Sequence, residues 1–358
     1  MHCFRLAELA RGLRLFLLGG AVLLLAGCNP FSSAEPMMDE YVERVARVLE
    51  LDPAFSELPP ASNLPRRRDR LLNIPELEMG MLDFLSLYGC ELQYVIGEKN
   101  SVMGKVMQPL NRLRYEIRFI ESGEECLSEI TREDVRESLL KAIQSKKETL
   151  PIAIWNATWG IQEIEPLFTL AKGNYPVVPE GNPVSDLAID ANRLNDTVAM
   201  LLAGNLSPSL DFVGEVHQRW QAEHRAGQLV NSARLLIARL GDGTALLKER
   251  IEGRPLCLNG KPNNQSNIVQ SMFFSVYIEK VQPYLATVKR AQEQLIDPLR
   301  RLATMQQSVM TAEFRRWQSR HLEAMGDESL WAQLDGAIAD HTRAWQTLLE
   351  QCGLRPQA

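Results

Sequence analysis

The sequence predicts an all-α protein, a multi-helix bundle or array with long polar loops, preceded by a cleaved N-terminal signal helix. Apolar residues recur at spacings of three and four, as in the stripe of Met38, Tyr41, Val45 and Leu49, and this period marks one face of an α-helix. No stretch shows the strict alternation and hairpin turns that are typical of β-strands. Prolines, glycines and polar residues separate the periodic stretches and supply the loops.

Prolines and polar loops divide the helices expected in the first half of the chain, over residues 38–49, 76–96, 109–120, 131–143 and 151–168. Pro53 ends the first helix, and the prolines between it and Pro75 favour an extended segment, because proline fixes φ and removes a hydrogen-bond donor. Thr131 is the expected N-cap of the fourth helix, with acidic residues at the positive end of the helix dipole. Pro151 is expected to begin the fifth helix.

The second half of the chain is expected to be more helical still, over residues 183–203, 208–240, 269–284, 295–309 and 329–351. Pro183 follows Asn182 at a first-turn position, which favours the start of a helix. Gly241-Asp242-Gly243 is expected to interrupt the second of these helices. In the last helix, apolar residues alternate at spacings of four and three, which indicates packing in a bundle.

A basic cluster, Arg66-Arg67-Arg68-Asp69-Arg70, lies in the proline-rich segment. The sequence leaves three interpretations of it open. Its arginines contact anionic lipid headgroups near a membrane anchor, or they form a solvated loop, or they pair with acidic helices elsewhere in the chain.

The N-terminal segment has the pattern of a bacterial secretion signal. Three arginines precede an apolar run over residues 15–25, which is shorter than the roughly 20 residues that span a membrane. The run ends in Leu25-Ala26-Gly27-Cys28, which resembles the lipobox of bacterial lipoproteins. The resemblance implies removal of residues 1–27, a diacylglyceryl thioether on Cys28 and attachment to an envelope membrane. The alternatives are an ordinary cleaved signal or an uncleaved apolar helix.

Removal of residues 1–27 leaves 331 residues, enough for one large or two ordinary domains. We expect a tether over residues 28–36, one α-helical domain over 37–352 and a tail over 353–358. The segment 173–183 is either an internal boundary or a long loop. The formal net charge of the precursor is −6, and loss of three Arg and one Glu with the signal leaves −8. An acidic chain has no electrostatic basis for binding nucleic acid.

Four cysteines remain after removal of Cys3 and acylation of Cys28, namely Cys90, Cys126, Cys257 and Cys352. They allow three pairings, and an oxidising envelope compartment favours two disulfides. We expect Cys90–Cys126 and Cys257–Cys352, one in each half, because the first two cysteines lie on opposite arms of a predicted helix–loop–helix. Zinc is a weaker interpretation, since the sequence has neither a CxxC pair nor a His/Cys cluster.

The loop over residues 97–105 is the strongest binding-site candidate in the first half. We expect its polar groups and those of the next helix to converge, the candidate residues being Glu98, Asn100, Ser101, Arg112 and Glu116. The loop is not a phosphate-binding P-loop, because that pattern requires Gly at Lys99 and Ser or Thr at Val106. The alternative is a capped turn between helices with surface ion pairs.

The remaining polar pairs do not have the spacing of a catalytic or metal site. His217 and His224 lie seven residues apart on one predicted helix, roughly 10.5 Å along its axis, which is too far for one metal ion. Asp186 and Asp190 form an i, i+4 pair that suits a solvated helix face. The sequence contains neither HExxH nor GxSxG. We therefore expect no metal and no cofactor.

Four motifs resemble an uncharacterised lipoprotein family of Gram-negative bacteria, a domain of unknown function. These motifs are Cys90-Glu91-Leu92, Glu98-Lys99-Asn100-Ser101 with Gly104, Leu113-Arg114-Tyr115-Glu116 and Gln282-Pro283-Tyr284-Leu285. The resemblance covers nearly the whole mature chain and brings no activity and no catalytic residue with it. It implies a single family-wide unit rather than two domains.

These observations lead to three functional hypotheses. The first is a non-enzymatic lipoprotein on the periplasmic side of the envelope, which binds an envelope protein or a cell-wall component as an adaptor. The second is an enzyme acting on a cell-wall or lipid substrate, with the Glu98 loop in its site. The third is a carrier of an apolar ligand in a bundle cavity. Asn29 after Cys28 is unlike the common inner-membrane retention signal, so we expect the outer membrane.

Overall fold

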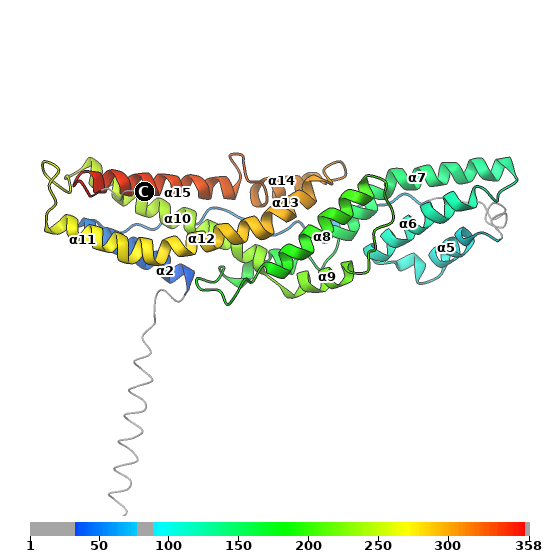
Figure 1. Cartoon of the computed structure of the whole chain (residues 1–358), viewed down its shortest axis with the longest axis horizontal. Coiled ribbons are helices and arrows are strands. Elements are labelled where there is room, and N and C mark those ends of the chain that lie inside the picture. The colour runs from blue at the N-terminus through cyan, green and yellow to red at the C-terminus, as the bar shows by residue number, and fades with distance from the viewer. Residues whose placement is uncertain (1–32, 77–88, 355–358) are drawn as a thin grey trace, which may run out of the picture.

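The computed structural model describes residues 33–76 and 89–354, and within these ranges it is all-α, as the sequence predicts. The helices pack side by side into an elongated rod (Figure 1). No helix within the described ranges is long and apolar enough to cross a membrane.

Thirteen α-helices occupy the described ranges. In chain order they are α2 (Ala34–Leu49), α3 (Arg67–Arg70), α5 (Glu91–Asn100), α6 (Pro109–Cys126), α7 (Glu133–Thr158), α8 (Ser185–Leu202), α9 (Val213–Ala222), α10 (Arg225–Glu252), α11 (Asn264–Met272), α12 (Gln282–Ala291), α13 (Asp297–Thr304), α14 (Ala312–His321) and α15 (Leu330–Glu350). Two π-helical segments, η5 (Phe273–Val281) and η6 (Gln292–Ile296), join α11, α12 and α13 into one helical run. Short 3₁₀ turns occur at η2 (Gly104–Val106), η3 (Pro166–Phe168) and η4 (Leu170–Lys172).

The two ends of the rod are built from different helices. At one end, α10 packs against α2 and α15, and α2 also packs against α11 and η5; we call this unit the bundle end. At the other end, α6 packs against both α5 and α7; we call this unit the three-helix end. Helices α8, α9, α13 and α14 lie between them (Figure 1). The buried apolar residues form one continuous cluster through both ends.

An extended segment over residues 51–66 and 71–76 runs along the rod from α10 toward α7. Arg234 donates from Nε to the Pro59 carbonyl at 2.6 Å. The Asn156 side chain donates to the Leu72 carbonyl at 2.7 Å and accepts from its N–H at 2.8 Å. These bonds satisfy backbone groups that an extended chain cannot pair within itself. The predicted extended loop is confirmed, except that Arg67–Arg70 form the single turn α3.

Two predicted helix breaks are wrong. Helix α7 continues through Pro151, because the loss of one backbone hydrogen bond is offset by burial of Leu150, Ile154 and Trp155. Helix α10 continues through the segment 241–243, and the chain instead breaks between α9 and α10. A Cβ on Gly243 would lie 3.0 Å from Cε1 of the His341 ring, so this glycine permits close helix packing and does not end a helix.

Several predicted boundaries also differ from the structure. The helix expected to reach residue 168 ends at Thr158, and the helix expected to end at residue 120 continues to Cys126. Helix α2 begins at Ala34, so the last three residues of the expected tether are helical, and Pro36 lies in the first turn, where its missing donor is tolerated. Part of the helix expected over residues 76–96 lies outside the described residues. Helix α5 begins at Glu91 and continues to Asn100, through the first half of the loop that the sequence predicted.

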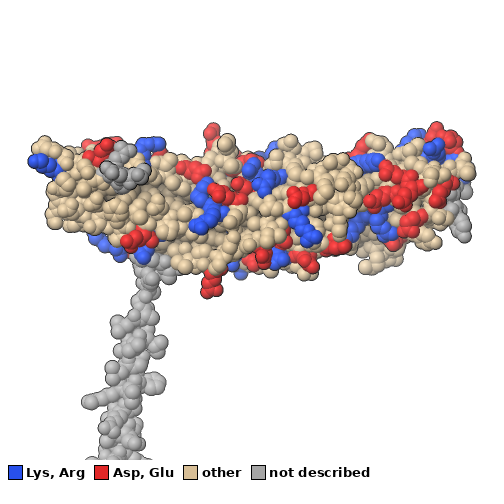
Figure 2. Space-filling view, viewed as in Figure 1, with Lys and Arg blue, Asp and Glu red and all other residues tan. Residues whose placement is uncertain are grey.

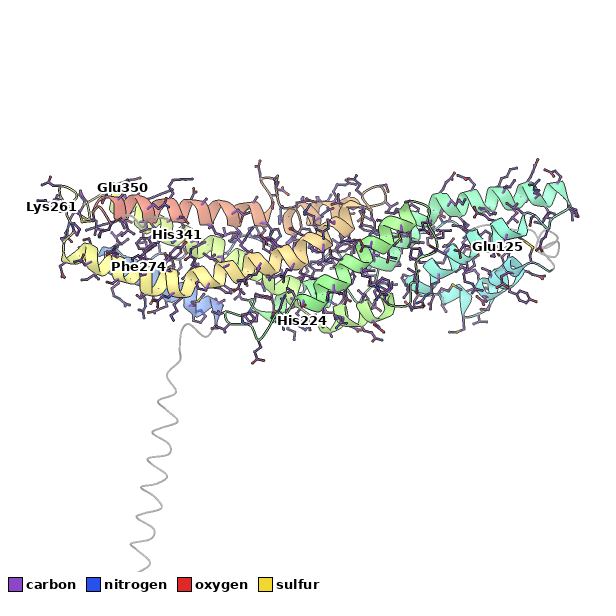
Figure 3. All side chains as sticks on the ribbon, viewed as in Figure 1. Glu125, His224, Lys261, Phe274, His341 and Glu350 are labelled. Carbon is purple, nitrogen blue, oxygen red and sulfur yellow. A yellow bond between two sulfur atoms is a disulfide. The ribbon has the colours of Figure 1, made fainter. Side chains whose placement is uncertain are left out.

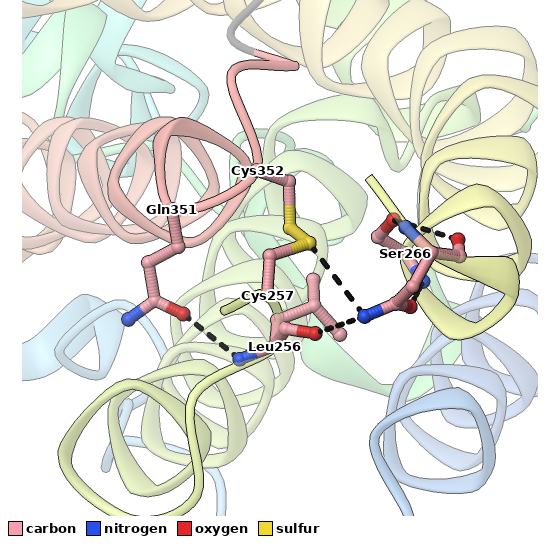
Figure 4. Close-up of a disulfide and its surroundings, with 6 residues drawn as sticks. Leu256, Cys257, Ser266, Gln351 and Cys352 are labelled. Carbon is pink, nitrogen blue, oxygen red and sulfur yellow. Dashed lines mark hydrogen bonds between the residues drawn. A yellow bond between two sulfur atoms is a disulfide. The ribbon is translucent and has the colours of Figure 1, made fainter. Parts of the chain in front are cut away.

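Both expected cysteine pairs lie at disulfide distance. Cys90 precedes α5 and pairs with Cys126, the last residue of α6. Cys257 pairs with Cys352 and joins the loop after α10 to the end of α15 (Figure 4). Asn263 supports this loop, because its side chain donates to the Leu256 carbonyl at 2.8 Å while capping α11. Each end of the rod therefore carries one disulfide.

Candidate functional site

The loop site expected from the sequence is not assembled. Glu98 is exposed and forms an ion pair with Arg118 at 2.8 Å. The Ser101 hydroxyl donates to the Glu98 carbonyl at 2.7 Å and accepts from the Gly104 N–H at 3.0 Å. Asn100 is exposed on the last turn of α5. This geometry is that of a capped turn with surface ion pairs.

The other two candidates, Arg112 and Glu116, lie inside the three-helix end. Glu116 is 1% exposed and forms ion pairs with Arg112 at 2.5 Å and with Lys146 of α7 at 2.8 Å. Burial lowers the pKa of Lys146, while Glu116 acts in the opposite direction. Lys146 also lies over the rings of Tyr115 and Phe119. The group is a closed core network with little access for a substrate.

A signal for this network does exist in the sequence, in the placement of two charged residues on apolar stripes. Glu116 follows Leu113 by three residues on the apolar stripe of α6, and Lys146 follows Ile143 by three on the stripe of α7. A charged residue on an apolar stripe requires a buried partner. The two stripes therefore predict a buried pair, which the loop-centred interpretation missed.

A neutral polar network occupies the bundle end, around His341 (Figure 3). The Thr244 hydroxyl donates to the Leu240 carbonyl at 2.7 Å, so it accepts from His341 Nδ1 at 2.9 Å. Tyr41 then donates to Nε2 of His341 at 2.5 Å, and Trp345 donates to the Tyr41 oxygen at 2.9 Å. Burial lowers the pKa of His341 to about 3. The imidazole is therefore neutral and structural.

The histidine and aspartate pairs noted in the sequence also have structural partners. His217 lies on α9, whereas His224 precedes α10, so they do not share a helix as predicted. Asp186 and Asp190 share one partner, Arg219, at 3.4 and 2.7 Å. Within the described ranges, no group of three or more His, Cys, Asp or Glu side chains is placed to hold a metal ion.

The arginines of the basic cluster fall into two groups in the structure: Arg70 is buried and the other three line a cleft. Arg70 is fully buried and donates to the carbonyls of Pro65 and Trp159 and, at 2.6 Å, to the Glu165 carboxylate. Burial lowers its pKa, and Glu165 opposes that change. Of the three interpretations, pairing with an acidic residue elsewhere holds for Arg70. The hydrogen bonds of Arg70 therefore connect α3 to the residues at and just after the end of α7.

The other three arginines of the cluster line an open cleft of about 530 Å³, which we call the arginine cleft. Its lining consists of Asn63, Leu64, Arg66, Arg67, Arg68, Gln162, Glu165, Phe168 and Thr169. The Arg66 side chain has no hydrogen bond or ion pair within the described part of the chain, and its carbonyl accepts from the Asp69 N–H at 2.8 Å. Arg68 is 73% exposed and lies 3.6 Å from Asp69, and Arg67 donates from Nε to the Gly160 carbonyl.

The arginine cleft extends into a second hollow of about 340 Å³ that shares Gln162, Glu165 and Thr169 with it. Helix α3 packs against α14, which lies along the edge of the rod opposite the start of α2 (Figure 1). The cleft therefore presents two exposed guanidinium groups on an otherwise acidic protein, those of Arg66 and Arg68, the second in a surface ion pair with Asp69. It is the surface in the described structure best suited to bind an anionic group.

A third cleft, of about 550 Å³, lies between the segment 173–184 and helices α8 and α9. Its charged lining residues are Glu180, Asp186, Arg219, Glu223 and Arg225. Arg219 pairs with Asp186 and Arg225 pairs with Glu223. Because these charges largely neutralise one another, this cleft offers no comparable anion site.

The fold and clefts define an all-α rod with two disulfide-bearing ends. Residues 38–356 match the family model described as "Protein of unknown function (DUF3080)". The chain therefore belongs to the DUF3080 family, which confirms the unknown-function domain that the motifs suggested. No curated protein and no solved structure matches the chain.

Proposed function

We propose that the protein is a non-enzymatic lipoprotein of the bacterial envelope, which binds an acidic segment of another envelope protein in the arginine cleft. The observation that carries this proposal is the contrast between ionisable groups in the core and in the cleft. Glu116, Lys146 and His341 have their partners inside the protein. Arg66 and Arg68 face solvent in a cleft, and the one ion pair of Arg68, with the exposed Asp69, leaves most of its guanidinium group accessible to a partner.

Charge supports an acidic protein segment as the ligand. The mature chain has a formal charge of −8, so most of its surface repels acidic partners and the cleft is a local exception. Charge complementarity between a cleft and its partner speeds their encounter and fixes how the two align. Arginine suits this role because its planar guanidinium group binds carboxylates with two parallel hydrogen bonds.

The lipobox-like tetrapeptide supports the anchor. Helix α2 begins at Ala34, six residues after Cys28. A fully extended chain spans at most about 3.5 Å per residue, so this tether reaches about 20 Å. A lipid on Cys28 would therefore hold the body close to the membrane, with the outer membrane favoured by Asn29.

The anchor is tested in cells by fractionation and by mass spectrometry of the mature N-terminal peptide. We expect a lipid-modified Cys28 and membrane association. The Cys28→Ala variant should lose the lipid and leave the membrane fraction. An N-terminal peptide that starts elsewhere, or an unmodified Cys28, would contradict the anchor.

The cleft is tested with a fluorescent Glu-rich peptide and anisotropy at low and high salt. We expect the double variant Arg66→Gln/Arg68→Gln to weaken binding at least about 10-fold, because charged hydrogen bonds contribute about 1.5–3 kcal/mol each. Arg316→Gln/Arg343→Gln is the matched control, since both arginines are 71% exposed in surface pairs. Equal affinities for the two double variants would contradict the assignment of the cleft.

A further inference from the structure

The connection between α5 and α6 carries an unusual group of exposed apolar side chains. Val102 is 84% exposed, Met103 77% and Val106 68%. No other five-residue window in the described ranges contains three large apolar side chains this exposed. We call these three residues the apolar wedge. Such a cluster on a water-facing surface marks a contact with a protein or a membrane.

Local hydrogen bonds and close backbone packing support the turn that carries the wedge. Ser101 caps it through the Gly104 N–H, and the Val106 N–H donates to the Met103 carbonyl at 3.2 Å. A Cβ on Gly104 would lie 2.1 Å from the Glu98 carbonyl oxygen, so the turn packs tightly on the end of α5. The exposed apolar side chains are therefore carried by a hydrogen-bonded turn.

The position of the wedge relative to the tether suggests its partner. The start of α2, the segment 173–184, α9 and the α5–α6 connection all lie along the same lower edge of the rod (Figure 1). All four therefore face the same side of the rod in this view, and acidic side chains also project from this side between α2 and α9 (Figure 2). In the space-filling view, the lower rim of the three-helix end is mostly uncharged (Figure 2).

We propose that this edge lies against the lipid bilayer that holds the Cys28 anchor, with the apolar wedge inserted among the lipids; this rests on the proposed lipid anchor. The short tether keeps the start of α2 within about 20 Å of the membrane surface. The wedge then supplies a second contact at the far end of the rod. Lys105, exposed beside the wedge, is placed to reach lipid phosphates while its methylenes stay in the apolar layer.

This orientation also leaves the α3 side of the arginine cleft accessible. Helix α3 packs on α14, along the edge opposite to the start of α2. With the lower edge on the bilayer, the cleft-bearing α3 lies away from the membrane.

Insertion is tested with an environment-sensitive fluorophore (NBD) on the lipidated protein in phosphatidylethanolamine/phosphatidylglycerol vesicles. The probe is attached at Met103→Cys, or at Met325→Cys as the matched control. Met325 is 85% exposed and lies in the connection between α14 and α15, on the upper edge of the rod (Figure 1). The introduced thiol is the only free one in the mature protein, because Cys3 is removed with the signal, Cys28 is acylated and the other four cysteines lie in disulfides.

We expect a blue-shifted emission at residue 103 that lipid-borne nitroxides quench, and emission typical of water at residue 325. Adding Val102→Ser and Val106→Ser should remove most of the shift at residue 103. Equal, water-like emission at both positions on a protein with a lipid-modified Cys28 would overturn the wedge and leave the anchor intact. An unmodified Cys28, found by mass spectrometry of the same sample, would overturn both.

Discussion

The bundle end and the three-helix end both bury polar groups, but in different protonation states. In the bundle end, His341 is neutral and shares hydrogen bonds with Tyr41 and Thr244. In the three-helix end, Glu116 and Lys146 form an ion pair at 2.8 Å with both side chains at most 3% exposed. The neutral network loses stability when its histidine is protonated, whereas the buried ion pair loses stability when one partner is removed.

This difference has a physical consequence for how each end fails. Protonating His341 would place an unpaired charge in the core of the bundle end. Removing Glu116 would leave Lys146 as an unpaired charge in the three-helix end, whereas removing Lys146 would leave Glu116 paired with Arg112 alone. A pH change tests the stability of the bundle end, and a substitution tests that of the three-helix end. Each end also carries a disulfide, and its removal should lower the free energy of unfolding more than either of these changes.

Removing the disulfides should have the largest effect, and the bundle end should lose more. The sequence separations are 95 residues for Cys257–Cys352 and 36 for Cys90–Cys126. The loop-entropy model assigns about 5 and about 4 kcal/mol to loops of these sizes. Denaturant unfolding of the two Cys→Ser double variants measures the difference. A greater loss for the shorter loop would contradict the entropic account.

Breaking the buried ion pair should destabilise the three-helix end by about 3–5 kcal/mol. Glu116→Ala leaves Lys146 buried without its carboxylate, and such a charge is costly. The double variant Glu116→Ala/Lys146→Met should recover part of that loss, because it removes the uncompensated charge. A double-mutant cycle measured by denaturant unfolding checks this. Additive losses would show that the two side chains do not interact.

Acid should weaken the bundle end and the adjoining α14 selectively. Burial lowers the pKa of His341 to about 3 and that of His321 to about 4, against about 6.5 in an unfolded chain. The unfolded state therefore binds more protons below pH 6.5, and stability falls as pH drops toward 3. The expected loss at pH 5 is about 2 kcal/mol per histidine.

Thermal unfolding between pH 7 and pH 5 measures this loss. His341→Gln should flatten the pH dependence, since the amide keeps donor and acceptor groups but does not titrate. His224→Gln, at a half-buried position outside the bundle core, is the matched control. An unchanged pH dependence in His341→Gln would show that this histidine does not carry the effect.

Two glycines of α10 should respond with opposite signs to the same substitution. A Cβ on Gly241 would meet no atom within 4 Å, whereas a Cβ on Gly243 would meet the His341 ring at 3.0 Å. We expect Gly241→Ala to stabilise by about 0.5–1 kcal/mol through helix propensity. Gly243→Ala should destabilise by about 1–3 kcal/mol through overpacking. Equal effects, measured by thermal unfolding, would contradict the close approach of α10 and α15.

Much of the fold was predictable from local patterns. Apolar periodicity predicted the all-α class, and the order of the cysteines along the chain predicted both pairs. The breaks at Pro151 and Gly243 were wrong because the rules for these residues are local, while their outcome depends on tertiary packing. Buried side chains before and after Pro151 keep its helix continuous. Gly243 leaves space for the His341 ring of α15.

The candidate site was less predictable than the fold. The sequence grouped Glu98 with Glu116, but these side chains face solvent and core respectively. The cluster 66–70 was visible, yet nothing local separates the buried Arg70 from the exposed Arg68. That separation depends on Glu165 and on the carbonyls at the end of α7, which lie about 90 residues away in the sequence.

The most direct test of the arginine cleft as a binding site is photo-crosslinking in living cells, with the photoreactive residue at Asn63. Asn63 is exposed and lines the cleft. Ile189 is the control position, because it is 62% exposed on α8 and does not line any of the three clefts. We expect a discrete protein adduct from position 63 that Arg66→Gln/Arg68→Gln abolishes, and none of that size from position 189. The same adducts at both positions, or an adduct at 63 that survives loss of both arginines, would contradict the proposal.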